Sequence, residues 1–312
     1  MRIFRACTQR AGPNTITIMV INGKRMAQDV IGHLKALPRP DRFLVAIVAR
    51  TDEATQSFIR QKERTAHELG INFRVYQCSG SVTTDEVAGT VLAYVADPAC
   101  GGIVIQLPLP PQVSLAAVLA ELPVEKDVDA IGEQAIRALA AGTAQVLPPA
   151  VGTVRHIILS ILGIPQEAMP GEEDGAVTAW LSSRRVAILG RGILVGQPVA
   201  RWLEGKVPNL TTIDVGDDHS PVRDADLVVS GMGQAGGLKP NDLRPGTTVI
   251  DFGYSKVTGN EQEVIGKKIS GDLDTSELQT SNLQRINFTP TPGGTGPILV
   301  AQLFENFYEL NQ

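Results

Sequence analysis

The sequence predicts an α/β fold of two domains around a cleft, the second a Rossmann-like, doubly wound parallel sheet. The chain has 312 residues, which corresponds to roughly two domains. Short apolar runs alternate with helix-like stretches, a rhythm typical of parallel strands with helices on both faces. The rhythm stops near 140–185, around Pro148-Pro149 and an acidic loop at 171–175, and then restarts. This break predicts domains at 17–150 and 151–290.

The first domain starts its pattern with Phe43–Ala49, a continuous apolar run that predicts a buried strand. The stretch from Glu53 to Leu69 predicts a helix that Gly70 ends. A threonine, Thr83 or Thr84, predicts the N-cap of another helix. The remaining predicted elements of this half are strands at 71–76 and 102–106 and helices at 84–97 and 114–122.

The second half begins with a connecting helix at Val151–Leu162. Arg185–Leu189 then predicts a strand and Gly196–Leu203 a helix, as in a nucleotide-binding unit. Further strands are expected at 210–215, 225–230 and 247–251. The last predicted helix is Pro297–Leu310, and we expect residues 297–312 to pack back on the first domain.

Composition and charge exclude several classes of function. The net charge of -5 and an aromatic content of 4% argue against a nucleic-acid partner. No apolar run approaches the roughly 18 residues of a membrane span. Residues 1–16 lack the apolar segment of a secretory signal and predict a loose leader. Cys7, Cys78 and Cys100 cannot all pair and have no metal-ligand spacing, so we expect a cytoplasmic protein without a metal.

A glycine-rich turn lies between the strand at 185–189 and the helix at 196–203. Gly190, Gly192 and Gly196 have the spacing G-x-G-x-x-x-G, one residue longer than the standard dinucleotide fingerprint. A sharp turn with backbone amides at a helix start favours binding of a pyrophosphate. The alternative is an ordinary strand-to-helix turn.

Two charged residues near this turn indicate different cofactors. Asp214 ends the following strand, about where a carboxylate binds the ribose hydroxyls of NAD. Arg191 lies inside the turn, where a guanidinium could meet the 2′-phosphate of NADP or touch the pyrophosphate. Because a carboxylate repels a 2′-phosphate, Asp214 favours NAD, unless it is simply a solvated strand-end residue. The expected cofactor is NADP or NAD, with NAD favoured.

Polar residues of the first domain form a second candidate site. Phe58 and Lys62 are four residues apart and share one face of a predicted helix. This helix follows a buried strand, which places Lys62 near the crevice where α/β sheets bind ligands. Gln106 ends a strand in the segment Gln106–Pro110, whose alternating prolines predict a stiff wall. The alternative for Lys62 is a surface lysine.

Two further segments carry carboxylates or a fixed backbone. Asp127 and Asp129 are two residues apart and would share one side of an extended loop. A metal is disfavoured there, because no further oxygen ligands follow at loop spacing. Residues 289–297 form the densest cluster of proline and glycine in the chain. A flexible linker would not need this many prolines, so we expect a loop with a fixed backbone.

In combination these motifs resemble the FolD family, the bifunctional methylenetetrahydrofolate dehydrogenase/methenyltetrahydrofolate cyclohydrolases. The resemblance runs from about Ile21 to the C-terminus. Its motifs, in the family order, are Gln106–Pro110, Lys126–Asp129, Gly190–Pro198, Gly271–Asp274 and Pro290–Pro297. The resemblance implies a folate-binding catalytic first domain, a Rossmann NAD(P)-binding second domain and a homodimer. The implied enzyme of one-carbon metabolism and purine biosynthesis oxidises 5,10-methylenetetrahydrofolate with NAD(P). It also hydrolyses the 5,10-methenyl form to 10-formyltetrahydrofolate.

The resemblance also implies roles for single residues. Lys62 matches the catalytic lysine, and Gln106 matches the glutamine that supports it. Asp127 matches an aspartate that binds the pterin ring, on which Phe58 could stack. The cofactor turn matches Gly190, Arg191, Gly192 and Gly196, and the loop beside the folate and the nicotinamide matches Gly293, Gly294 and Pro297.

Three departures from the family pattern modify these expectations. Phe58 stands where the family has tyrosine, so a phenol oxygen is missing and we expect a reduced cyclohydrolase activity. Residues 147–150, Leu-Pro-Pro-Ala, replace a Pro-Cys-Thr-Pro loop, and Asp214-Val215 replaces His-Ser, which favours NAD. The alternatives are a dehydrogenase only, or a non-catalytic relative that binds folate or nucleotide. A hydroxyacid dehydrogenase is disfavoured because the histidines lie in no acid–base motif.

Overall fold

The computed structural model describes residues 19–165, 172–214, 216–257, 268–276 and 286–312, and the leader expected at 1–16 lies outside them. The first domain is built on a parallel sheet with the strand order β3-β2-β4. Its strands are β2 (Phe43–Val48), β3 (Phe73–Gln77) and β4 (Cys100–Gln106). Val48 lies beside both Gln77 and Gln106, so the three strands end at the same edge.

Helices cover both faces of this sheet. Leu44 of β2 belongs to a core cluster with α1, α2 and the C-terminal helix, whereas Val45 belongs to a cluster with α3 and α4. The helical elements of this domain are α1 (Gly23–Ala36), α2 (Glu53–Leu69), α3 (Thr84–Ala96), α4 (Leu115–Ala120), the 3-10 helix η1 (Val124–Lys126) and α5 (Glu133–Ala141). The sequence analysis did not identify α1 and α5.

Local signals explain the ends of α2 and α3. The Asp52 carboxylate accepts a hydrogen bond from the Thr55 amide (2.8 Å) at the start of α2, and Gly70 ends this helix. Thr83 is the N-cap of α3 and forms a capping box with Glu86. Asp52 and Gly70 thus set the two ends of α2, the helix that carries Lys62.

The second domain contains a parallel six-stranded sheet with the order β1-β11-β8-β7-β5-β6. The chain goes from β5 to β6 on one side and then to β7 on the other side of β5. This reversal is the topological switch point at which such sheets bind nucleotides. The strands are β1 (Met19–Val20), β5 (Arg185–Leu189), β6 (Asn209–Ile213), β7 (Leu227–Ser230), β8 (Thr248–Asp251) and β11 (Asn287–Phe288), and β9 (Ser255–Val257) pairs with β10 (Lys268–Ser270) in a separate antiparallel ladder.

The two faces of the second sheet are covered differently. One face packs against α6 (Pro149–Leu162), α7 (Glu172–Leu181) and α8 (Gly196–Leu203). The other face packs against η2 (Ser220–Asp224), residues that flank η3 (Pro240–Asp242), and irregular segments. The acidic segment 171–175, expected as a loop, instead lies largely in α7, a helix that the sequence analysis did not identify. The predicted α/β class with a Rossmann-like parallel sheet is confirmed.

Strand β1 joins the second sheet, although the sequence analysis placed residues from 17 onward in the first domain. It pairs in parallel with β11, and the Ile21 amide donates a hydrogen bond to the Phe288 carbonyl (2.8 Å). Met19 pairs with Asn287, more than 260 positions away in the chain. The sequence did not indicate this placement, because the backbone groups of so short a strand are satisfied by a distant partner.

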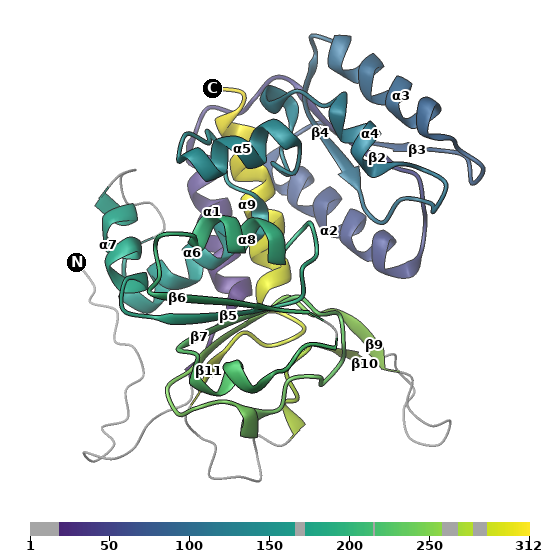
Figure 1. The fold of residues 1–312 in the computed structure, drawn as a ribbon. Helices are drawn as coiled ribbons and strands as arrows, with labels where there is room; N and C mark the ends of the chain where they lie inside the picture. Colours follow the sequence, from purple (N-terminus) through teal and green to yellow (C-terminus); the bar gives the residue numbers. More distant parts are fainter. Residues whose placement is uncertain (1–18, 166–171, 215, 258–267, 277–285) are drawn as a thin grey trace.

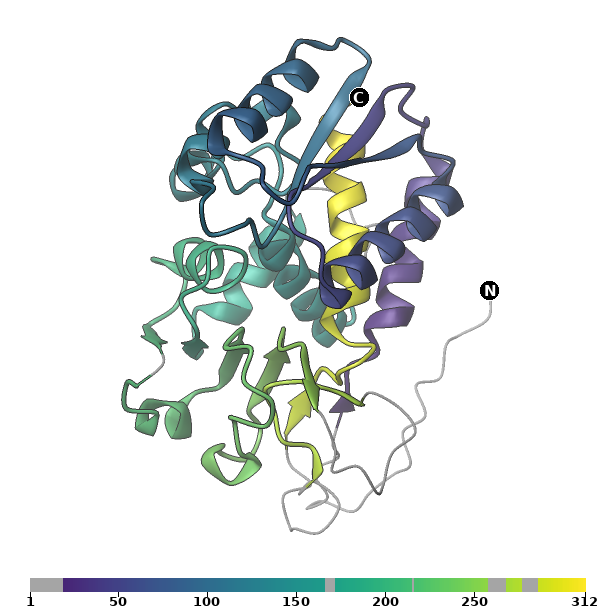
Figure 2. The same cartoon turned by 90° about the vertical axis from the view of Figure 1, so that its right-hand side faces the viewer.

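The C-terminal helix α9 (Thr295–Glu309) runs from the second sheet into the first domain (Figures 1 and 2). It packs against α1, α2 and α6. The side-chain amide of Asn306 donates hydrogen bonds to the carbonyls of Val128 and Leu147, each at 2.8 Å. These bonds hold α9 against the first domain, and at its start the Thr295 hydroxyl donates to the Asp251 carbonyl of the second domain, so α9 ties the two domains together.

Candidate active site

A buried lysine and a strand-end glutamine form the centre of the candidate site. Lys62 of α2 is 8% exposed, and its Nζ donates a hydrogen bond to Oε1 of Gln106 (3.0 Å) at the end of β4. The Gln106 side chain in turn donates to the Leu107 carbonyl (2.9 Å), which fixes the amide orientation. The structure thus brings together the two residues to which the resemblance assigned catalysis.

Burial and a nearby carboxylate act on Lys62 in opposite directions. Burial lowers the pKa of the Lys62 ammonium because the charged form loses hydration, and the charge of Asp129 raises it. Burial likewise raises the pKa of Asp129, and the charge of Lys62 lowers it. The sequence analysis named Asp129 only as a neighbour of Asp127. In the structure, Asp129 is the carboxylate that acts on the lysine.

Asp127 has different surroundings. Its side chain is 1% exposed, and its Oδ2 accepts a hydrogen bond from the Gly132 amide (2.7 Å). Its Oδ1 has no hydrogen-bond partner among the described residues. A turn closed by the Ala130 amide and the Asp127 carbonyl (3.1 Å) separates Asp127 from Asp129, so the two carboxylates are not on one side of an extended loop. Burial raises the pKa of Asp127 to about 7.

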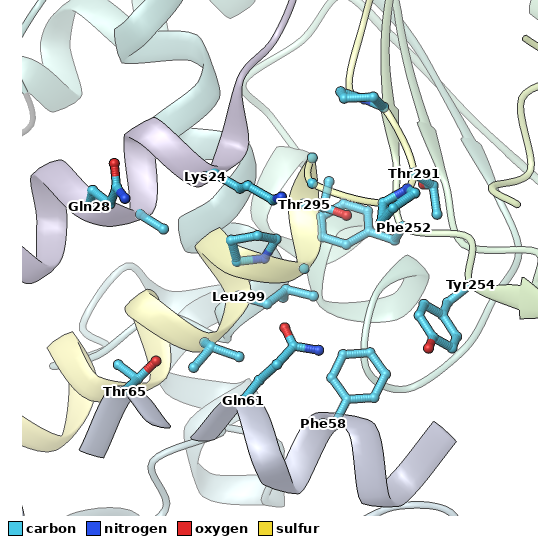
Figure 3. Close-up of a pocket in the computed structure, with 18 of the residues that line it drawn as sticks. Lys24, Gln28, Phe58, Gln61, Thr65, Phe252, Tyr254, Thr291, Thr295 and Leu299 are labelled. Atoms are coloured by element: carbon cyan, nitrogen blue, oxygen red, sulfur yellow. The ribbon is translucent and has the colours of Figure 1, made fainter. Parts of the chain in front are cut away.

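A pocket of about 500 Å³ lies between the two domains, on the face of α2 that carries Phe58, Gln61 and Thr65 (Figure 3). Its walls come from α1, α2, α9 and the loops that follow β8 and β11. The predicted substrate-binding residues that line it are Phe58, Gly293, Gly294 and Pro297. Lys62 and Gln106 are not part of the lining, and Lys62 lies one helical turn beyond Phe58. The predicted site therefore consists of a pocket and an adjacent buried pair.

Phe58 contacts an aromatic ring of the second domain. Its ring centroid lies 5.5 Å from that of Tyr254, with an interplanar angle of 53°. Tyr254 follows β8, so the contact joins α2 to the strand-end edge of the second sheet. The sequence analysis missed Tyr254. Its place just after a strand of a parallel sheet, where ligands bind, is the signal that could have indicated it.

The loop between β11 and α9 is held from both domains. The Thr295 hydroxyl donates a hydrogen bond to the Asp251 carbonyl (2.8 Å). The Lys24 amide of α1 donates to the Gly293 carbonyl (3.2 Å). The loop that contains Gly293, Gly294 and Pro297 is therefore a fixed wall of the pocket.

The turn between β5 and α8 fits a phosphate-binding role. Gly190 has a φ of 92°, and a Cβ at Gly196 would overlap the Gly190 carbonyl oxygen, so both positions require glycine. A Cβ at Gly192 would meet no protein atom within 4 Å, so this part of the turn faces open space. No side chain caps the start of α8, but the Gln197 amide donates to the Gly192 carbonyl (3.1 Å) and Pro198 has no amide hydrogen, so the glycine positions carry the comparison with a phosphate-binding turn. These features favour a dinucleotide turn over an ordinary one.

Arg191 is oriented by a carboxylate. Its Nη2 donates to Asp217 Oδ2 and to the Thr212 carbonyl, both at 3.2 Å. The same oxygen of Asp217 accepts the Asp214 amide (2.8 Å). Asp217 therefore links Arg191 and Asp214, the two residues that indicated different cofactors. The sequence analysis missed Asp217, since no spacing in the sequence marks it.

The described part of the chain contains no group of three or more His, Cys, Asp and Glu side chains placed to hold a metal ion. None of its helices has the length and apolar character needed to cross a membrane. Cys78 and Cys100 are free and buried, and burial raises the pKa of both thiols.

Fold and site together define a two-domain α/β protein with a glycine-rich turn of the dinucleotide-binding type in one domain and a buried lysine–glutamine pair in the other. Ile193 of the turn packs against the same core cluster of the first domain as Leu107 and Leu109, the residues that follow Gln106. Residues 21–129 match the family description "Tetrahydrofolate dehydrogenase/cyclohydrolase, catalytic domain". Residues 176–312 match "Tetrahydrofolate dehydrogenase/cyclohydrolase, NAD(P)-binding domain".

Named relatives and a solved structure agree with this match. "Bifunctional protein FolD" of Deinococcus radiodurans is 31% identical over 267 residues, which cover 84% of this chain and 80% of the relative. "Bifunctional protein FolD 2" of Haloarcula marismortui is 30% identical and covers 84% of both chains. The structure of the Trypanosoma brucei N5,N10-methylenetetrahydrofolate dehydrogenase-cyclohydrolase, complexed with NADP and an inhibitor, is 26% identical. It matches with a TM-score of 0.79 over 95% of this chain and 98% of that one.

The chain belongs to the tetrahydrofolate dehydrogenase/cyclohydrolase family, the FolD family. The family and the enzyme class predicted from the sequence are thereby confirmed, as is an NAD(P)-binding domain.

Proposed function

We propose that the protein oxidises 5,10-methylenetetrahydrofolate with NAD and hydrolyses the 5,10-methenyl product to 10-formyltetrahydrofolate at a lower rate. The observation that carries the proposal is the buried hydrogen bond between Lys62 and Gln106 (3.0 Å), beside a pocket that opens between the domains. It supplies a basic group to a reaction that must move protons, next to a wall suited to a flat ring.

The oxidation requires positioning more than acid–base catalysis. In our proposal, Phe58 and the loop with Gly293, Gly294 and Pro297 hold the folate in the pocket. The turn from Gly190 to Gly196 holds the pyrophosphate of the dinucleotide. The bound cofactor supplies the hydride acceptor, C4 of its nicotinamide. No proton donor is needed in this step, so Phe58 can serve without a hydroxyl.

The hydrolysis requires a proton acceptor. Water adds to the methenyl carbon, and we assign Nζ of Lys62 as the group that takes its proton. The same group can return a proton to the pterin nitrogen N5 as the bond from N5 to that carbon breaks, and the hydroxyl on that carbon releases its proton to solvent to leave the formyl group. Burial lowers the pKa of Lys62, which increases the fraction of neutral amine available for this role. Gln106 holds the amine in place. The charge that acts on Lys62 is that of Asp129 and not that of Asp127, so we assign the carboxylate beside the lysine to Asp129.

We propose NAD as the preferred cofactor. The charge of Arg191 is compensated by the Asp217 carboxylate at 3.2 Å. Asp214 directly follows strand β6, and its amide donates to the same carboxylate of Asp217. A 2′-phosphate would therefore meet two carboxylates and one neutralised guanidinium. The ribose hydroxyls of NAD can instead donate hydrogen bonds to these carboxylates.

We also propose a homodimer in the cytoplasm. Strand β3 is an edge of the first sheet, and Val75 and Tyr76 on it are 40% and 42% exposed. An exposed edge with large apolar groups favours pairing with a second copy. Light scattering should give the mass of a dimer, and Tyr76→Arg should shift it to a monomer. The free, buried Cys78 and Cys100 suit a reducing compartment.

An absorbance assay tests the catalytic proposal. Purified protein receives methylenetetrahydrofolate with NAD or NADP, and methenyltetrahydrofolate decay is followed separately. We expect faster reduction of NAD than of NADP and a slower, measurable hydrolysis. Equal rates of oxidation and hydrolysis would contradict the reduced cyclohydrolase activity. Oxidation without hydrolysis would identify a dehydrogenase only, and no turnover with either cofactor would identify a non-catalytic relative.

A further inference from the structure

We propose that Tyr254 supplies, from the second domain, the substrate-facing hydroxyl that Phe58 lacks on α2. The inference rests on the proposed folate function and adds a substrate-contacting residue to that site. The observation that carries it is the contact between the two rings, whose centroids lie 5.5 Å apart. Of the ring pairs in the described residues, this one alone joins the two domains.

The hydroxyl of Tyr254 lies on the correct side of the pocket for this role. Phe58 and Tyr254 both line the pocket. In Figure 3, the hydroxyl end of Tyr254 points toward α2, beside the ring of Phe58. A tyrosine at position 58 would carry its hydroxyl at the tip of that ring. Tyr254 thus brings the same chemical group to the same wall from the opposite domain.

The backbone on both sides of Tyr254 is fixed. The Asp251 carboxylate accepts hydrogen bonds from the amides of Gly253 (2.7 Å) and Leu273 (2.9 Å). On the other side, the Ser255 hydroxyl donates to the Gly233 carbonyl (3.0 Å). Because both neighbours are held, the ring of Tyr254 has a defined position over Phe58. A hydroxyl held in this way is prepared to bind a ligand at a fixed point.

The hydroxyl of Tyr254 is available to a substrate. The residue is half-buried, and its hydroxyl forms no hydrogen bond with any residue that the structure describes. A phenol can both donate and accept, so it can bind a pterin or amide group, or hold the attacking water. Hydride transfer needs no such donor, whereas hydrolysis must hold a water and a developing charge. The hydroxyl should therefore matter more for hydrolysis than for oxidation.

The test removes and relocates this hydroxyl. Tyr254→Phe should lower kcat for hydrolysis of methenyltetrahydrofolate by about 3- to 10-fold, the value of one neutral hydrogen bond. It should change kcat for oxidation by less than about 2-fold. The exchanged variant, Phe58→Tyr with Tyr254→Phe, restores a hydroxyl on α2 and should recover hydrolysis. Tyr94→Phe is the matched control, because Tyr94 lies on α3 outside the pocket lining.

A second measurement keeps the inference testable whatever the rate of hydrolysis. Equilibrium binding of tetrahydrofolate should weaken by about 3- to 10-fold in Tyr254→Phe and not in Tyr94→Phe. Unchanged hydrolysis and unchanged binding in Tyr254→Phe would overturn the inference. So would loss of hydrolysis that the exchanged variant fails to recover. Absence of all turnover by the wild-type protein would instead refute the proposed function, while the binding measurement would still decide the role of Tyr254.

Discussion

The guanidinium of Arg191 lies 3.2 Å from the carboxylate of Asp217, at the end of the strand that follows the nucleotide turn. Both side chains are about half exposed, so the pair itself adds little to stability. The pair matters because it sets the net charge that a bound cofactor meets at this end of the strand. A single arginine inside a dinucleotide turn favours a 2′-phosphate, but an arginine already paired with a carboxylate does so much less. We therefore expect the cofactor preference to depend on Asp217.

Asp217→Asn should shift the preference toward NADP. Removing one exposed negative charge near the 2′-position should raise kcat/KM for NADP relative to NAD by about 2- to 5-fold. The shift should shrink at high salt, because exposed charges are screened. Asp218→Asn is the matched control, since Asp218 bonds to Ser220 and not to Arg191. An unchanged ratio in Asp217→Asn would show that this carboxylate does not face the cofactor.

Lys62→Met should abolish most of the hydrolysis while much of the oxidation remains. The variant keeps the length of the side chain but removes the proton acceptor, and loss of a general base lowers rates by about 100- to 10,000-fold. Oxidation needs positioned partners and should fall by no more than about 10-fold. Lys35→Met, an exposed lysine paired with Glu68, serves as the control. Equal losses of both activities would argue against a proton-transfer role for Lys62.

The pH dependence of hydrolysis should follow the titration of Lys62. If the neutral amine is the active form, the rate should rise with pH through the lowered pKa of Lys62 and level off above it. The charge of Asp129 raises that pKa, so Asp129→Asn should move the rising limb to lower pH. The rate profile over a pH series checks this, with Glu63→Gln as a control, because Glu63 is an exposed residue of α2 outside the pocket lining. If the rising limb of the rate profile of Asp129→Asn stays in place or moves to higher pH, the assignment of Lys62 as the proton acceptor is contradicted.

The sequence predicted most clearly the features that depend on local chemistry. Gly70 ends its helix, and Gly190 and Gly196 form a turn that no other residue would allow, because backbone geometry leaves a direct mark on residue type. Contacts across long distances left no such mark. Tyr254 reaches Phe58, and Asp217 reaches Arg191, only after the sheets have assembled. The spacing in the sequence also could not distinguish Asp127 from Asp129, because a hydrogen-bonded turn buries one and leaves the other beside Lys62.

The buried Asp127 should make stability depend on pH. Its pKa is raised from 3.8 to about 7 in the folded protein, so folding favours the protonated form. This contribution is fully present below the unfolded pKa and is lost as the pH rises through about 7. Between about pH 5 and pH 8, the unfolding free energy of wild type should therefore fall by about 2–3 kcal/mol more than that of Asp127→Asn. Urea titrations at both pH values measure this, with the exposed Asp29→Asn as a control. Parallel pH dependence in wild type and Asp127→Asn would exclude Asp127 as its source.

Two glycines of the nucleotide turn should respond differently to the same substitution. A Cβ at Gly196 would overlap the Gly190 carbonyl oxygen, so Gly196→Ala should cost about 1–3 kcal/mol of stability or more. A Cβ at Gly192 meets no protein atom within 4 Å, so Gly192→Ala should keep the melting temperature of wild type. Its methyl group would occupy space that we assign to the pyrophosphate, and NAD binding should weaken by about 10-fold or more. Calorimetry for unfolding and for NAD binding separates the two effects. A Gly192→Ala variant that binds NAD as tightly as wild type would mean that the open side of the turn does not receive the cofactor.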